Sequence, residues 1–189
     1  WKITNGQVDF SYVGYEQSGS NWWYVYGGQV CFQATDVLPG TVGGQYGWWK
    51  VCEGKVNFDD DVCENAYGWW KITTGKVDFQ YTGLAQNACG WWMIQNGHVN
   101  FGSNGLVDNG NGWWLVRNGC VDFTYNGLVD NGNGWWLIRN GYVDFDYNGL
   151  VDNGNGWWLV KNGCVDFSYQ GYVQNECGVW WVSNGQVQF

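Results

Sequence analysis

Two adjacent tryptophans return along this chain at a fixed interval. From Trp69 to Trp157 each pair begins 22 residues after the one before, and from Gly112 to Cys177 the intervening residues repeat with few changes. Near-identity at a fixed period indicates a repeat architecture. Counting outward from the regular copies gives nine copies of one unit, with the first and last incomplete, so we expect the chain to be part of a longer array.

The spacing is looser near the start of the chain. Trp23 and Trp49 are 26 residues apart, and we expect the extra residues, 33–46, to form an inserted loop that projects from the array. The last copy keeps the 22-residue frame only if Val179 replaces the first tryptophan. We therefore treat residues 1–189 as a single solenoid array with irregular copies at 1–67, regular copies at 68–178 and a partial last copy at 179–189.

Each regular copy contains a turn signal between two strand-forming runs. Trp-Trp-Leu-Val and Cys-Val-Asp-Phe flank Asn118 and Gly119. Asn-Gly favours a type I′ turn, which requires positive φ at both central residues. This turn fixes the register and pairs Val116 with Val121. The sequence therefore predicts an all-β fold, a repeat β-solenoid of stacked β-hairpins with about nine copies of a 22-residue unit.

The register assigns each side chain to a face, because side chains alternate along a strand. Val116, Trp114 and Phe123 share an apolar face, which we expect to be buried between stacked hairpins. All eight basic residues fall on the other face, as do the recurring aspartates. We expect this second face to be exposed, with cross-strand ion pairs such as that of Lys2 with Asp9.

The first tryptophan of each pair falls on the face that we expect to be exposed. A large exposed aromatic side chain that repeats in register is a candidate ligand platform. The alternative is that it packs against the next hairpin as core, and the neighbouring aspartates are either structural or ligand contacts. The candidate ligand-binding residues on this face are Trp69, Trp91, Trp113, Trp135, Trp157, Asp122, Asp144 and Asp166.

Composition and charge exclude several classes of function. The net charge is −9, which disfavours nucleic acid and anionic membrane surfaces as partners. No apolar run is long enough to cross a bilayer. No Ser/His/Asp set or phosphate-binding glycine loop is present, so we expect no enzyme activity and no cofactor.

The seven cysteines show no zinc-ligand spacing, so we expect no metal site. Disulfides between neighbouring loops, such as Cys63 with Cys89, and free thiols both remain open. Loops such as Asp130-Asn131-Gly132-Asn133 alternate oxygen donors with glycine, but they lack the later glutamate of an EF-hand, and turn formation explains their composition. Other copies have Cys, Tyr, Lys or Gln in place of His98, so we interpret His98 as a surface residue.

The repeated stretch Gly-Trp-Trp-Leu-Val-Arg-Asn-Gly-Cys-Val-Asp-Phe-Thr-Tyr-Asn-Gly resembles the cell-wall-binding repeats of Gram-positive surface proteins. That family includes choline-binding modules, glucan-binding repeats and the short repeats of clostridial toxins. The resemblance spans essentially the whole chain. It implies a β-hairpin solenoid with ligands between successive hairpins, held by aromatic side chains. By this resemblance the second-strand tyrosines join the first tryptophans as ligand walls: Tyr125, Tyr147 and Tyr169.

The chain departs from the choline pattern in two respects. It has Trp-Trp followed by Leu, Lys or Met where that family has a run of Trp and Tyr, and its connection is lengthened to Gly-Leu-Val-Asp-Asn-Gly-Asn. We therefore expect a secreted, non-catalytic module at the cell surface or cell wall that binds a cell-wall polymer or glycan through choline or sugar units. The alternatives are a structural stalk or self-associating fibre, and an adhesin for a host protein.

Overall fold

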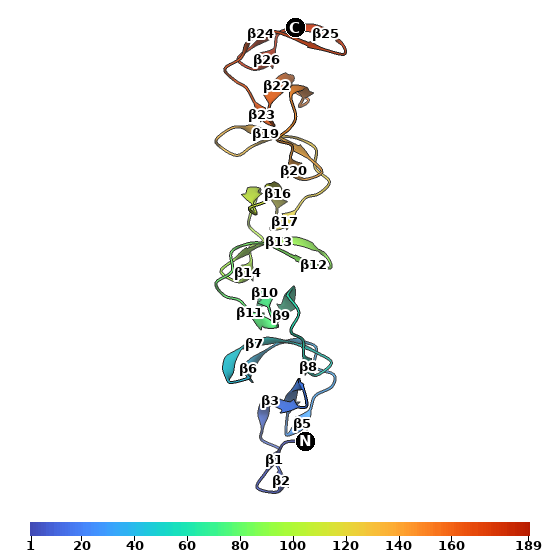
Figure 1. Ribbon diagram of the computed structural model, residues 1–189, viewed down its shortest axis with the longest axis vertical. Helices are drawn as coiled ribbons and strands as arrows, with labels where there is room; N and C mark the ends of the chain where they lie inside the picture. The colour runs from blue at the N-terminus through green and yellow to red at the C-terminus, as the bar shows by residue number, and fades with distance from the viewer. The chain divides into compact units, whose positions relative to one another are not determined.

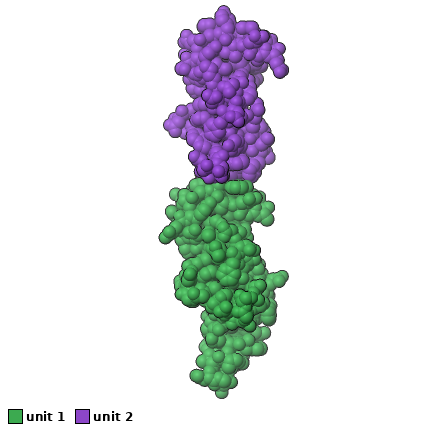
Figure 2. Space-filling view, viewed as in Figure 1, with its two compact units in different colours: residues 1–100 green, residues 101–189 purple.

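The computed structural model describes all residues, 1–189, and every regular element in it is a β-strand. The chain divides into two compact units, residues 1–100 (unit 1) and 101–189 (unit 2), coloured separately in Figure 2. Within each unit, hairpins follow one another as a stack (Figure 1). The all-β repeat fold predicted from the sequence is confirmed. No helix that could span a membrane is present.

Unit 1 is built from fourteen strands. They are β1 (Ile3–Thr4), β2 (Gln7–Val8), β3 (Val13–Ser18), β4 (Asn21–Tyr26), β5 (Gln29–Val30), β6 (Asp36–Val42), β7 (Gln45–Cys52), β8 (Lys55–Val56), β9 (Asp61–Asn65), β10 (Gly68–Thr73), β11 (Lys76–Val77), β12 (Gly83–Asn87), β13 (Gly90–Gln95) and β14 (His98–Val99).

Unit 2 is built from twelve strands. They are β15 (Gly105–Asp108), β16 (Trp113–Arg117), β17 (Cys120–Val121), β18 (Gly127–Asp130), β19 (Trp135–Arg139), β20 (Tyr142–Val143), β21 (Gly149–Asp152), β22 (Trp157–Lys161), β23 (Cys164–Val165), β24 (Gln170–Asn175), β25 (Gly178–Ser183) and β26 (Gln186–Val187).

The predicted reversals are present in every copy. Asn118 has φ of 50° and Gly119 has φ of 77°, as a type I′ turn requires, and Val116 pairs with Val121 as expected. The register of the predicted hairpin is therefore confirmed. The nine reversals begin at Asn5, Gly27, Glu53, Thr74, Asn96, Asn118, Asn140, Asn162 and Asn184.

Each tryptophan strand is the centre of a three-stranded group. The segment Gly-Leu-Val-Asp, which we expected to be a connection, is a strand in three of the copies. In one of them Leu128 of β18 pairs with Leu137 of β19, and Val129 pairs with Trp136. The Asp-Asn-Gly-Asn loop is thus the turn of a second hairpin, and the tryptophan strand belongs to both hairpins.

Backbone hydrogen bonds join each copy to the next. The amide of Leu115 donates to the carbonyl of Gly141, in the reversal of the following copy, at 2.8 Å. The same bond recurs from Leu137 to Gly163 at 2.8 Å. A Cβ atom at Gly141 would collide with the backbone of Asp122, so the reversal needs glycine both for its positive φ and for this close approach.

The face of an interior hairpin that we expected to be exposed is partly buried. Leu115, on the face assigned to water, is only 3% exposed and packs against Ile138 and Val143 of the next copy. The assignment is wrong because a hairpin inside a stack has a neighbour on each side. The predicted ion pair is also wrong, since Lys2 bonds Glu16 at 2.6 Å instead of Asp9.

The expected contrast between the two adjacent indoles is wrong as well. Trp113 and Trp114 are both half-buried, so neither is fully enclosed and neither stands free in water. Phe123, which we assigned to the buried face, is 42% exposed. The short second strand, β17, ends at Val121, so the alternation of faces no longer applies to residues beyond it.

The expected inserted loop is mainly a strand. Residues 36–42 form β6, which pairs with β7 through a tight reversal at Gly43 and Gly44. The longer hairpin docks on its neighbour, since the hydroxyl of Tyr15 donates to the carbonyl of Leu38 at 2.9 Å. The extra residues therefore lengthen one hairpin of the stack.

The frame proposed for the last copy is confirmed. Val182 pairs with Val187, as Val116 pairs with Val121 in a regular copy. Trp180 then takes the place of the second tryptophan, which leaves Val179 in the place of the first.

Candidate functional site

An aromatic trio forms at several junctions between one copy and the next within a unit. Its members are the first tryptophan of one copy, and the second tryptophan and the phenylalanine of the following copy. The ring centres of Trp113 and Trp136 are 5.0 Å apart. Phe145 lies 6.0 Å from Trp113 and 5.7 Å from Trp136. The rings meet at tilted or edge-on angles, an arrangement that aromatic side chains favour.

The trio recurs with nearly the same geometry. Trp135 lies 4.9 Å from Trp158 and 5.8 Å from Phe167. Unit 1 contains an equivalent group, in which Trp48 lies 5.4 Å from Trp70, and Phe79 lies 5.5 Å from Trp70. The repeat thus builds one aromatic site several times.

The trios are only partly closed to solvent. In two of them the phenylalanine is exposed, 42% for Phe167 and 47% for Phe79, and the tryptophans are half-buried. Ring faces and edges at such a surface can stack on a sugar or attract a cation.

In unit 1 a related group lines an open cleft of about 350 Å³. Trp22, Trp49 and Phe58 are the trio residues there, and Lys76 from the following copy completes the wall. The tip of the lengthened hairpin, at Val42, forms another side. This cleft lies at the lower end of the range of small-ligand pockets, about 300–1,000 Å³.

The predicted tyrosine walls already carry a cation from their own copy. The guanidinium of Arg117 lies 4.3 Å from the ring centre of Tyr125. Arg139 covers Tyr147 at 4.6 Å, and Lys161 covers Tyr169 at 4.4 Å. A cationic ligand on these tyrosines would have to displace that side chain, so Trp and Phe are the more accessible aromatic surfaces.

The recurring aspartates are engaged in the same local structure. Asp122 Oδ1 accepts hydrogen bonds from the hydroxyl and amide of Thr124, at 2.7 Å and 3.0 Å, and these bonds lower the pKa of the Asp122 carboxyl. Its Oδ2 pairs with Arg117 at 3.3 Å. Asp144 and Asp166 make the corresponding ion pairs. Ser168 bonds Asp166 in the same way as Thr124 bonds Asp122, so these two aspartates order a bend. All three aspartates hold the cation near its tyrosine.

Three of the predicted tryptophans remain. Trp69 packs beside Trp92, with ring centres 5.0 Å apart. Trp91 is half-buried on β13, opposite Gln86 of β12. Trp157 of unit 2 lies 5.8 Å from Trp180. Trp69 and Trp157 thus each lie against the second tryptophan of the next copy.

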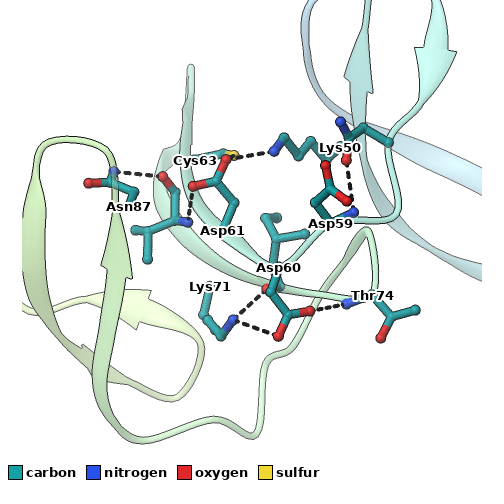
Figure 3. A network of polar contacts seen from close by, with 11 residues as sticks. Lys50, Asp59, Asp60, Asp61, Cys63, Lys71, Thr74 and Asn87 are labelled. Atoms are coloured by element: carbon teal, nitrogen blue, oxygen red, sulfur yellow. Dashed lines mark hydrogen bonds and ion pairs between the residues drawn. The ribbon is translucent and has the colours of Figure 1, made fainter.

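A polar network in unit 1 surrounds Lys50 (Figure 3). The Lys50 ammonium donates to Asp61 Oδ2 at 2.6 Å, and the Cys63 thiol donates to the same oxygen at 3.3 Å. Burial raises the pKa of Cys63 to about 12, and the carboxylate of Asp61 adds to this effect. Cys63 is therefore an unreactive thiol. No disulfide joins the seven cysteines, so the free-thiol alternative describes this structure.

The second tryptophan of each pair differs between copies in whether its indole N–H has a hydrogen-bond acceptor. Two residues join the strands of the second hairpin in some copies, here called short-loop copies, and four residues join them in the long-loop copies. In short-loop copies the side chains of Asn65 and Asn87 accept hydrogen bonds from the indoles of Trp70 and Trp92, both at 2.9 Å. In long-loop copies the buried indole nitrogens of Trp136 and Trp158 have no acceptor. The longer loop therefore removes a hydrogen bond from the aromatic site.

Two parts of this site were not predicted from the sequence. The phenylalanines were expected in the core and His98 at the surface, whereas His98 packs edge-on against Trp70, with ring centres 4.9 Å apart. The available signal was the variation of the His98 position among copies that otherwise agree.

Part of this chain is similar to a known family of repeats. The choline-binding repeat family matches four stretches, at residues 80–100, 102–122, 124–144 and 146–166. No curated protein matches the chain significantly.

Three solved structures are similar at low identity. Choline-binding protein F from Streptococcus pneumoniae is 20% identical, with a TM-score of 0.37 over 91% of this chain and 58% of that chain. A complex of the same protein with ipratropium gives 20% identity, the same TM-score of 0.37, and coverage of 91% and 60%. Alternansucrase in complex with isomaltononaose is 13% identical, with a TM-score of 0.33 over 99% of this chain and 16% of that chain.

The chain thus spans less than two thirds of the length of these proteins. The likeness to choline-binding repeats therefore depends on the four matched stretches, which together cover less than half of the chain.

Proposed function

We propose that this chain is a non-catalytic binding module that holds a choline-bearing or carbohydrate polymer at the bacterial cell surface. The observation that carries the proposal is the recurring, partly open aromatic trio, as in Trp113, Trp136 and Phe145. The match to choline-binding repeats supports the same class of ligand.

The trio offers two kinds of recognition. A quaternary ammonium group gains about 0.5–2 kcal/mol from each aromatic face that it contacts. A sugar ring can stack its apolar side on an indole, with its hydroxyl groups directed to solvent. We propose the first tryptophans Trp69, Trp91, Trp113, Trp135 and Trp157 as ligand walls. Tyr125, Tyr147, Tyr169 and the aspartates Asp122, Asp144 and Asp166 hold the surrounding structure and contact ligand at most at its edge.

Several weak sites on one chain suit a repetitive polymer. Once one site holds the polymer, the next binding event is intramolecular, so the overall affinity exceeds that of a single site by roughly 100-fold or more when the spacing permits. A secreted location at the cell wall, where such polymers are found, fits this mode of binding.

A fluorescence titration tests the proposal. The chain would be titrated with choline, teichoic acid fragments, glucan oligosaccharides and host glycans while tryptophan emission is followed. We expect a saturable change with choline or with one class of glycan, and a weaker response in Trp135→Leu. Tyr26→Ala is the control, because Tyr26 is 65% exposed and belongs to no trio.

The outcome separates the alternatives. If the emission change in Trp135→Leu equals that of the unmodified chain, the ligand binds away from the trio that contains Trp135. No response to any probe would contradict a binding role for these aromatics and favour a structural stalk.

A further inference from the structure

One position of the repeat varies while its surroundings stay almost constant. It is the residue that follows the Asn-Gly reversal, here called the post-turn residue. In the three copies that begin at Trp113, Trp135 and Trp157 the preceding strand changes only between Val and Ile and between Arg and Lys. The post-turn residues of the last seven copies are Lys55, Lys76, His98, Cys120, Tyr142, Cys164 and Gln186.

Strand pairing places the post-turn residue opposite the second tryptophan of the preceding copy. Opposed residues of antiparallel strands share a face of the sheet and lie in contact. The pairs are Trp23 with Lys55, Trp49 with Lys76, Trp70 with His98, Trp114 with Tyr142, Trp136 with Cys164, and Trp158 with Gln186.

Where the post-turn side chain is long or aromatic, it contacts the indole directly. Tyr142 lies 4.8 Å from Trp114, and the Lys76 ammonium lies 5.8 Å from the centre of the Trp49 ring. The glycine that begins the tryptophan strand makes room for this contact, because a Cβ at Gly112 would collide with the Tyr142 ring. The post-turn residue is thus a fourth wall beside the trio.

The cleft in unit 1 shows the four walls together. Trp22, Trp49 and Phe58 line it, and Lys76 lines the same space. The stem of Lys76 lies across Gly47, which directs the ammonium group over the Trp49 ring. A cation from the chain itself therefore occupies the ring face that a cationic ligand would use.

Building on the function proposed above, we propose that the post-turn residue determines which ligands each aromatic site accepts, and that Lys76 closes the Trp49 site to quaternary ammonium groups. A second cation at Trp49 would lose the ring face to Lys76 and would meet a like charge at close range. Tyr142 instead presents a neutral ring at the Trp114 site. A neutral sugar carries no charge for Lys76 to repel.

The experiment counts choline molecules bound per chain, by equilibrium dialysis at saturating choline. Lys76→Met removes the charge and keeps an unbranched stem across Gly47, so we expect one additional choline per chain. Lys76→Arg keeps the charge and serves as the matched control, with an unchanged count. Tyr142→Lys introduces a cation at the Trp114 site and is expected to remove one bound choline.

Each result decides the proposal. If the intact chain binds choline and Lys76→Met leaves the count unchanged, the post-turn inference fails while the proposed function stands. If neither the intact chain nor Lys76→Met binds choline, the inference fails, and glucan binding alone then decides the proposed function. An equal gain in Lys76→Arg would show that charge is not the cause, and would also overturn the inference.

Discussion

Asn87 Oδ1 accepts a hydrogen bond from the indole N–H of Trp92, five residues later, at 2.9 Å. The amide nitrogen of the same side chain donates to the carbonyl of Val62 at 2.9 Å. Asn87 therefore fixes the indole and also ties its hairpin to the preceding copy.

Asn87→Ala is expected to lower the free energy of unfolding by about 1–3 kcal/mol, because it leaves a buried donor and an acceptor unpaired. Asn131→Ala is the matched control. Asn131 holds the same place in a long loop, but its side-chain oxygen accepts a hydrogen bond only from the amide of Asn133. Asn131→Ala should therefore lower the free energy of unfolding by less. Urea denaturation followed by circular dichroism measures both, and equal losses would contradict the role of the indole bond.

Gly141→Ala should destabilise the array far more than Gly132→Ala. Both glycines have positive φ, 77° and 83°, and an alanine at either position loses roughly 1–2 kcal/mol on that account. At Gly141 the added Cβ also collides with the backbone of Asp122, whereas at Gly132 it meets open space. The difference in melting temperature between the variants measures the collision, and similar values would refute the close packing of successive copies.

Trp135→Ala and Trp136→Ala are both expected to be destabilising, by about 2–4 kcal/mol, because each indole packs in a cluster of neighbouring copies. Because both rings are only half-buried, we expect a smaller loss of unfolding free energy than for a fully buried tryptophan. Denaturant titration checks this expectation. A Trp135→Ala variant as stable as the unmodified chain would mean that its contact with Trp158 contributes nothing to packing.

Cys89 should react quickly with a thiol reagent at pH 8, and Cys63 slowly. Cys89 is exposed in a hairpin turn. Burial and the neighbouring Asp61 carboxylate raise the pKa of Cys63 to about 12, so little thiolate forms there. Mass spectrometry after timed alkylation reports the order of labelling. Early labelling of Cys63 would contradict its place in the Lys50 network.

Asp61 should make the stability of unit 1 sensitive to acid. Burial raises the pKa of its carboxyl, but hydrogen bonds from Lys50, the Val62 amide and Cys63 outweigh burial and leave the pKa lowered. A lowered folded-state pKa stabilises the fold at pH values above the ordinary carboxyl pKa, about 4, and this contribution is lost as the pH falls further. Asp61→Asn should therefore weaken the fold at pH 7 and flatten the acid side of the stability profile, and an unchanged profile would count against the network.

Local sequence signals predicted the parts of the fold that depend on local geometry. Asn118 and Gly119 form the expected turn because positive φ is a property of those two residues and the register follows from the turn. The burial of Leu115 was not predictable in the same way. Its cover comes from Ile138 in another copy, and a pattern within one hairpin does not show whether one face or both faces are stacked.

The candidate site was only partly predicted, because its contacts also come from neighbouring copies. Trp113 was identified because an aromatic residue repeats in register, and it does lie where two copies meet. Phe123 was assigned to the core because we extended the alternation of faces past Val121, where β17 ends. The cations over the tyrosines were also missed, since the approach of Arg139 to Tyr147 depends on the bend that follows the short strand.

The most direct measurement of the central claim is an NMR titration that follows the indole N–H resonances of the intact chain with choline and with a glucan oligosaccharide. The account predicts saturable shifts at the trio indoles, including Trp136 and Trp158, at millimolar ligand. The ring C–H resonances of the exposed Tyr26, recorded alongside, should show no response. Indole resonances that stay unchanged with both ligands, or shifts confined to residues outside the trios, would contradict it.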